Sequence, residues 1–189
     1  MSCRHDARRA ARAFLNADMQ GHFARITYRN EEIKVKKYDR LIFASNSDTA
    51  VGPMAEAILQ SKYLLEELEI TSKGIVVLFP EPINPKAEAI LVSHGLTMKH
   101  HMSEPLHKED FTERTLVITF DEELRQRLIK EYEPEFENRI QVLPEYVGKG
   151  EALLNPYGGS LADYGQCFEA LEALISRLVI HLNEEELLC

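Results

Sequence analysis

Short apolar runs alternate with longer amphipathic segments along the chain from residue 39 to the C-terminal end. The apolar runs predict four strands, at 40–45, 74–79, 115–120 and 139–146. Apolar residues at helical spacing predict four helices, at 53–69, 86–95, 121–133 and 161–182. Because strands and helices alternate, the pattern predicts an α/β domain with a parallel sheet and helices on both of its faces.

The first 38 residues follow a different pattern. A helix is predicted over 4–23 and a β-hairpin over 25–35, so we divide the chain into a basic N-terminal extension, 1–38, and a domain, 39–189. The formal charge is +5 in the extension and −14 in the domain, within a net charge of −9. This division favours docking of the extension on the domain of the same chain or of a second copy, which includes a homodimer. A nucleic-acid partner is not expected, because the acidic domain would repel its phosphates.

Composition excludes few classes of protein. A chain of 189 residues with 44% apolar and 28% charged residues fits one globular domain. No apolar run approaches the roughly 20 residues of a membrane span, so no membrane partner is expected. The cysteines lie far apart without metal-site spacing, which favours a reduced, cytoplasmic protein without metal or other cofactor: Cys3, Cys167 and Cys189. Adjacent histidines in an extended segment point apart, so loop packing is favoured over a metal cluster for His100, His101 and His107.

The loop 45–52 is the candidate site on topology alone. It joins the first strand of the domain to its first helix, and ligands of parallel α/β sheets bind at the carboxyl ends of the strands. Unpaired amides at a helix N-terminus attract anions, so the loop has the form of an anion cradle. Its sequence nevertheless contains Asp48 and neither lysine nor arginine.

The motifs along the domain resemble those of the low-molecular-weight protein tyrosine phosphatase family, in the order that this family has them. The resemblance covers about residues 39 to 183 and rests on "GPMAEAIL", "SKG", "NPKAEAILVSHGL", "LVITFDEE" and "NPYGGSLADY". It implies a flavodoxin-like three-layer α/β sandwich with a four-stranded parallel sheet.

The same resemblance implies that the family's chemical groups are missing here. Ser45 stands at the position of the nucleophilic cysteine, Val51 at that of the phosphate-binding arginine, and Asn155 at that of the general-acid aspartate. Three further loop positions also differ: Ser47 replaces a glycine, Asp48 an asparagine, and Gly52 the hydroxyl residue that steadies the thiolate. An alcohol needs an adjacent base to act as a nucleophile, valine cannot clamp phosphate, and asparagine has no proton to give.

We therefore interpret the chain as a catalytically inactive phosphatase-like protein, a binding or structural module for an unknown protein or small-molecule ligand. The predicted ligand-binding residues are Ser45, Asn46, Ser47, Asp48, Thr49, Ala50, Val51, Gly52 and Tyr157, with Asn155 nearby. Asp48 is expected to place its carboxylate against an incoming anion. The alternative is a weakly active or chemically altered phosphatase of the same family, which uses Ser45 or recruits another group. Arsenate reduction, which similar folds support, is excluded because the loop has no cysteine.

Overall fold

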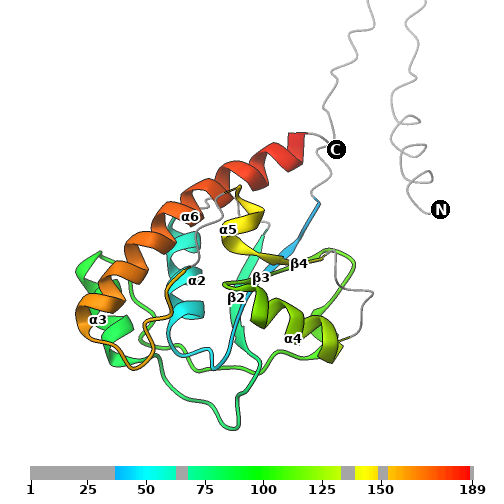
Figure 1. The fold of residues 1–189 in the computed structure, drawn as a ribbon. Helices are drawn as coiled ribbons and strands as arrows, with labels where there is room; N and C mark the ends of the chain where they lie inside the picture. The colour runs from blue at the N-terminus through cyan, green and yellow to red at the C-terminus, as the bar shows by residue number, and fades with distance from the viewer. Residues whose placement is uncertain (1–36, 63–67, 133–138, 149–152, 188–189) are drawn as a thin grey trace, which may run out of the picture. The chain divides into compact units, whose positions relative to one another are not determined.

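A parallel four-stranded sheet lies at the centre of the computed structural model, which describes residues 37–62, 68–132, 139–148 and 153–187 (Figure 1). The strands have the order β2-β1-β3-β4. Their bounds are Arg40–Ser45 for β1, Glu69–Gly74 for β2, Thr115–Thr119 for β3 and Ile140–Val142 for β4. The predicted four-stranded parallel sheet is confirmed.

Helices cover both faces of this sheet, as the strand–helix alternation predicts (Figure 1). Four helices pack on one face or on each other there: α2 (Val51–Lys62), α3 (Pro85–Ser93), α5 (Leu143–Tyr146) and α6 (Leu161–Leu187). The opposite face is covered by α4 (Glu122–Tyr132) beside β3 and β4. A short 3-10 turn, η1 (Lys108–Asp110), lies in the long connection between α3 and β3. The arrangement is the flavodoxin-like three-layer sandwich.

The core follows the two-residue alternation of β1. Leu41 and Phe43 face the larger apolar cluster with α2 and α6, whereas Ile42 and Ala44 face the smaller cluster with α4. All four side chains are fully buried, which explains why "RLIFAS" is apolar at successive positions. Burial on both faces holds the carboxyl end of β1, and with it the loop 45–52, in a fixed place.

The second strand is not where the apolar pattern predicts it. The prediction of 74–79 is wrong, because β2 is the more polar segment Glu69–Gly74, in register with β1 from Arg40 opposite Glu69 to Ser45 opposite Gly74. The ladder continues only through the amides of Ile75 and Val76, beyond which β1 offers no partner. The remaining apolar residues form a loop on the surface. Similarly, the predicted fourth strand is strand only over Ile140–Val142 and then turns into α5.

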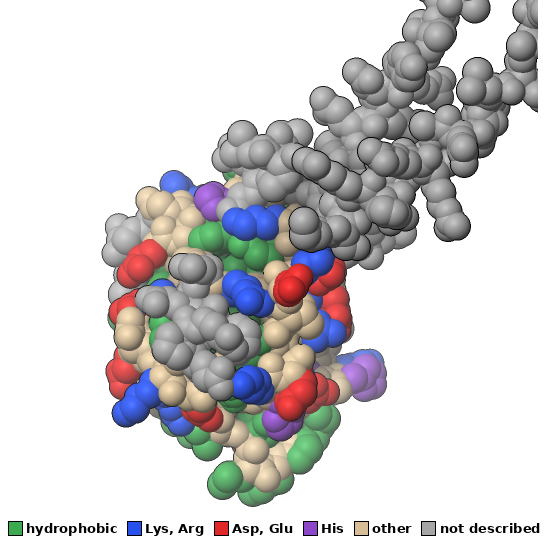
Figure 2. All heavy atoms as spheres, turned by 90° about the vertical axis from the view of Figure 1, so that its right-hand side faces the viewer, with side chains coloured by type: hydrophobic (Ala, Val, Ile, Leu, Met, Phe, Trp, Pro, Cys, Tyr) green, Lys and Arg blue, Asp and Glu red, His purple; other side chains and the backbone are tan. Residues whose placement is uncertain are grey.

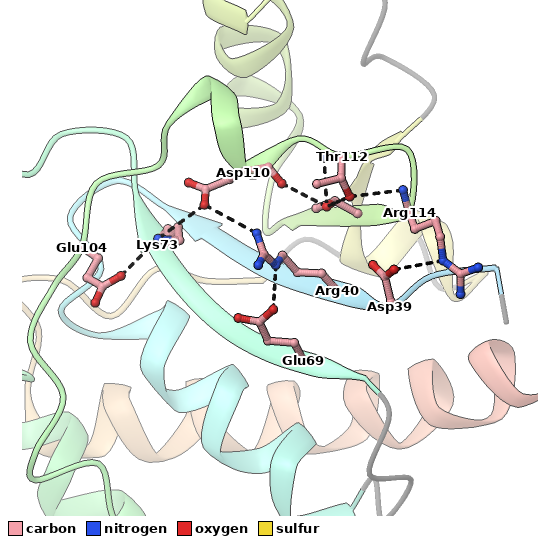
Figure 3. A network of polar contacts seen from close by, with 9 residues as sticks. Asp39, Arg40, Glu69, Lys73, Glu104, Asp110, Thr112 and Arg114 are labelled. Atoms are coloured by element: carbon pink, nitrogen blue, oxygen red, sulfur yellow. Dashed lines mark hydrogen bonds and ion pairs between the residues drawn. The ribbon is translucent and has the colours of Figure 1, made fainter.

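Ion pairs join the connection before β3 to residues of β1 and β2 (Figure 3). The carboxylate of Asp110 lies 3.7 Å from Lys73 Nζ and 3.9 Å from Arg40 Nη1. Lys73 also contacts Glu104 at 3.1 Å, and Arg40 contacts Glu69 at 2.8 Å. These contacts position the segment 101–110, whose first residue reaches the candidate site.

Of the N-terminal extension, 1–38, only residues 37 and 38 are described. The predicted helix, hairpin and homodimer contact lie outside the described residues and stay predictions. Within the described part of the chain, no helix is both long enough and apolar enough to cross a membrane.

Candidate functional site

The loop between β1 and α2 is held in one conformation by its own side chains. Asp48 has a left-handed backbone with φ of 56°, a conformation that aspartate tolerates better than most residues. Its amide donates a hydrogen bond to Ser45 Oγ over 3.1 Å. The hydroxyls of Ser47 and Thr49 lie 2.9 Å apart and share a hydrogen bond. The loop is therefore a turn that internal hydrogen bonds hold in one conformation.

Neighbouring segments bind the carbonyl groups of this loop. Asn84, the N-cap of α3, donates its amide to the carbonyl of Thr49 over 2.7 Å, and Val76 donates to Asn46 over 2.8 Å. By contrast, the amides of 49–52 have no hydrogen-bond partner among the described residues. The N-terminus of α2 thus presents free N–H donors, as the predicted cradle requires.

Asp48 points away from the crevice, which corrects the expectation that its carboxylate faces a bound anion. The residue is fully buried, and Oδ2 accepts a hydrogen bond from the amide of Glu104 over 3.1 Å. His101 Nε2 lies 3.3 Å from the same oxygen and donates to the Asp48 carbonyl over 2.8 Å. The left-handed backbone turns this side chain beneath the loop, where the segment 101–104 covers it.

The pKa values beneath the loop favour a charged His101. Burial acts to lower the pKa of His101, but hydrogen bonds to Asp48 and the charges of Asp48 and Glu56 outweigh it, so the pKa is raised. Burial also raises the pKa of Glu56, against the hydrogen bond that Ser72 Oγ donates to it over 2.8 Å. When His101 is protonated, its positive charge compensates the buried carboxylate of Asp48, and this pair supports the loop from below.

Gly52 leaves one oxygen of Asp48 without a partner. Among the buried side-chain atoms of the described residues, Asp48 Oδ1 is one that accepts no hydrogen bond. A Cβ built on Gly52 would lie 3.1 Å from this oxygen and 3.0 Å from Ser45 Oγ. Any side chain at this position would therefore be in tight contact with both groups.

A crevice of about 320 Å³ opens above the loop at the carboxyl ends of the strands. It is lined by Ser45, Asn46, Ser47, Thr49, Ala50, Val51, Glu81, Phe120, Asp121, Leu124, Leu153, Asn155 and Tyr157. Of the predicted residues, Asp48 and Gly52 are not in this lining. Sequence reasoning missed Glu81, Phe120, Asp121, Leu124 and Leu153. Phe120 and Asp121 directly follow β3, so the rule that placed Ser45 here could have found them.

Two polar side chains of the crevice, Ser45 and Asn155, accept hydrogen bonds from the backbone of their own loops. The hydrogen bond of Ser45 Oγ comes from the Asp48 amide, and no described base contacts the hydroxyl. The amide oxygen of Asn155 accepts a hydrogen bond from the Tyr157 backbone over 3.1 Å, within its own turn. Tyr157 is 75% exposed at the rim. The described part of the crevice thus has neither a thiol nor a positively charged side chain.

Among the described residues, the other cysteine and histidine candidates do not form a second site. Cys167 is buried in α6, and burial raises the pKa of its thiol to about 12, so it stays a neutral thiol. His101 is committed to Asp48, and His100 is exposed. Among the described residues, no three side chains of the metal-binding types converge.

Comparison with known proteins places the chain in a family. The sequence pattern of the family described as "Low molecular weight phosphotyrosine protein phosphatase" matches residues 40–187. A low molecular weight protein-tyrosine-phosphatase PtpB of Staphylococcus haemolyticus is 30% identical over 143 residues, which cover 74% of this chain and 96% of that protein. A protein-arginine-phosphatase of Bacillus subtilis is 31% identical over 150 residues, covering 77% of this chain and 97% of the relative.

A solved structure of a related phosphatase has a similar fold, in agreement with these sequence matches. The YwlE arginine phosphatase from Geobacillus stearothermophilus superposes with a TM-score of 0.72 at 28% identity, covering 78% of this chain and 95% of that one. The family pattern matches residues 40–187, and the relatives and the solved structure each cover about three-quarters of this chain. The chain belongs to the low molecular weight phosphotyrosine protein phosphatase family.

Proposed function

We propose that this chain is a catalytically inactive member of its family, a pseudophosphatase that uses the crevice above the loop 45–52 to bind a partner. The observation that supports this most directly is the lining of the crevice, in which no described side chain is a thiol, a lysine or an arginine. Phosphotransfer in such a site depends on a strong nucleophile and on cationic groups that stabilise the transferred phosphoryl group. Neither requirement is met by the described residues.

The residues at the three family positions, Ser45, Val51 and Asn155, each support catalytic inactivity on physical grounds. Ser45 has a hydroxyl whose pKa is far above neutral in the absence of a base, whereas a thiol at a helix N-terminus ionises readily. Val51 is apolar and only 8% exposed, so it offers no hydrogen bond to an equatorial phosphate oxygen. Asn155 has no titratable proton for a leaving group. A single difference could be compensated elsewhere, but three in one crevice leave no step of the reaction supported.

The binding role is supported by what the chain retains. The loop keeps its hydrogen-bonded conformation, its free amides and its anchoring to α3. The buried pair of Asp48 and His101 maintains it from below. A crevice of about 320 Å³ is of a size that accepts one side chain or a small molecule.

The proposal predicts no turnover of either class of substrate for which the relatives are named. Purified protein incubated with an aryl phosphate and with a phosphoarginine peptide should release phosphate at the buffer rate, with the Bacillus subtilis arginine phosphatase as the active control. Activity that persists in Ser45→Ala would indicate a contaminant. Activity that is abolished by Ser45→Ala would overturn the proposal.

A second candidate function has one specific observation in its favour. A solved mutant of the YwlE arginine phosphatase, with serine in place of a cysteine, has a phosphorylated active-site serine. By the family resemblance, Ser45 stands at the position of the nucleophile. Its hydroxyl could therefore take the phosphoryl group as the P–N bond to arginine breaks and the hydroxyl proton passes to the departing nitrogen, with no later hydrolysis of the phosphoserine. Intact-mass analysis after incubation with the phosphoarginine peptide tests this. Stoichiometric addition of one phosphoryl group, absent from Ser45→Ala, would replace the binding role by a phosphoryl-acceptor role.

A further inference from the structure

The crevice has a negative charge that the sequence did not predict. Glu81 and Asp121 both contribute to its lining, from the loop after β2 and from the residue before α4. Glu81 is positioned by two hydrogen bonds to the buried Ser103: its amide donates to Ser103 Oγ over 2.9 Å, and its carbonyl accepts from the Ser103 amide over 2.8 Å. Asp121 Oδ1 accepts from the amide of Leu124 over 2.7 Å, which leaves Oδ2 for a ligand.

The two helix N-termini beside the crevice do not cancel this charge. Each N-terminus is equivalent to about half an elementary positive charge, so α2 and α4 together offset about one of the two carboxylates. No described lysine or arginine lines the crevice. Beneath the loop, His101 lies 3.3 Å from the Asp48 carboxylate and offsets its charge when protonated. An entering group therefore meets a net negative potential, which attracts a cation and repels a phosphate dianion.

The remaining lining matches a guanidinium better than a compact ammonium. A guanidinium has five N–H donors in a plane and stacks on aromatic rings. The lining offers the exposed ring of Tyr157, beside the largely buried ring of Phe120, together with the side-chain oxygens of Ser45 and Ser47. The free loop amides could in turn donate to a carbonyl group next to such a side chain.

Exposed apolar residues lie in segments beside the crevice. Leu78 is 88% exposed, and Phe79, two residues before Glu81, is 64% exposed. Tyr157, in the lining segment 153–157, is 75% exposed. Figure 2 views the molecule from the right-hand side of Figure 1 and shows hydrophobic side chains at its lower end. The loop after β2 lies at the same end in Figure 1. Large apolar side chains gathered at one end of a protein commonly mark a protein-binding surface.

We propose that the crevice binds an arginine side chain of a partner protein, with Glu81 and Asp121 contacting the guanidinium and with Leu78 and Phe79 contacting an apolar residue of the same segment. This inference rests on the proposed binding function and names the chemical class of its ligand. It makes the crevice a reader of unphosphorylated arginine rather than a site for phosphate.

Three matched peptides test the inference in calorimetric titrations of the full chain. The first has an arginine next to a leucine, the second replaces arginine by citrulline, which has the same shape without the charge, and the third contains phosphoarginine. The arginine peptide should bind roughly tenfold more tightly than the other two, and its affinity should fall as salt is added. Glu81→Gln and Asp121→Asn should each remove most of this preference. Glu169→Gln, which alters an exposed carboxylate of α6 outside the lining, is the matched control and should leave it unchanged.

The outcomes separate this inference from the proposed function. Equal affinity for the arginine and citrulline peptides would overturn the arginine assignment, and so would a preference for phosphoarginine. Binding of none of the three peptides would overturn it as well. Phosphate release from the phosphoarginine peptide would instead overturn the proposed inactivity. If Phe79→Ala leaves affinity for the leucine-containing peptide unchanged, the apolar part of the contact is wrong.

Discussion

Asp48 shows how one buried charge can organise a loop. Removing a carboxylate from water is costly unless it is paired and hydrogen-bonded, and here one oxygen is satisfied by Glu104 and His101 while the other is not. The sequence alone could not reveal this arrangement, because a left-handed residue can present its side chain to either side of a turn. His101 lies 53 residues away, and only the tertiary fold brings it beneath the loop.

At the scale of single residues, we predict that the free energy of unfolding depends on the charge of His101. Because its pKa is raised in the folded state, the Asp48 contact is fully stabilising below the ordinary pKa of about 6.5 and is lost as the pH rises through the raised value. The raised pKa of Glu56 acts in the same direction. His101→Gln should therefore lower the free energy of unfolding by about 1–2 kcal/mol near pH 6, and by less near pH 9.

Urea unfolding of the two proteins across this pH range checks the prediction. His100→Gln is the matched control, because His100 is the exposed neighbour of His101, and it should leave the pH profile of the parent unchanged. A constant difference between His101→Gln and the parent at every pH would show that packing, rather than charge, explains the effect.

Among the elements, predictability depended on burial. β1 and β3 are buried at nearly every position, so their apolar runs located them. β2 is an edge strand with alternating exposure, and the more apolar segment after it was mistaken for the strand. Apolar residues at 78 and 79 signal a surface, which composition cannot distinguish from a core. The same error concealed Glu81 as a member of the crevice.

At the scale of an element, Asp121 caps α4 in addition to its proposed contact with a guanidinium, and the two roles can be tested separately. As the residue before α4, it caps the helix by accepting the amide of Leu124. Asp121→Ala should lower the free energy of unfolding by about 1 kcal/mol, whereas Asp121→Asn should retain most of the stability, because asparagine also caps well. Thermal or urea unfolding measures both. Equal losses for the two variants would contradict the capping role and would make Asp121→Asn unsuitable for the peptide test.

Across the whole molecule, topology brings the candidate site together from four separate segments. The rule that ligands bind at the carboxyl ends of parallel strands predicted the loop 45–52, and the family resemblance added Asn155 and Tyr157. Neither source indicated the charge of the crevice, because that charge depends on which side chains of the connecting loops turn inward. The scaffold and its local chemistry are thus separable, and substitutions in the crevice should alter the chemistry without altering the fold.

That separation predicts that phosphate binding can be restored. Val51 lines the crevice at the first residue of α2, beside the free amides, so Val51→Arg should supply the missing clamp and strengthen phosphate binding by roughly tenfold or more. Val51→Gln is the uncharged control. Adding Ser45→Cys, Gly52→Ser and Asn155→Asp should restore turnover of an aryl phosphate, although a Cβ at position 52 requires small shifts around Ser45. A combined variant that keeps its circular dichroism spectrum but neither binds nor cleaves phosphate would show that the loss extends beyond these four side chains, since a thiol, an arginine, a hydroxyl and a general acid would then be present on an intact fold.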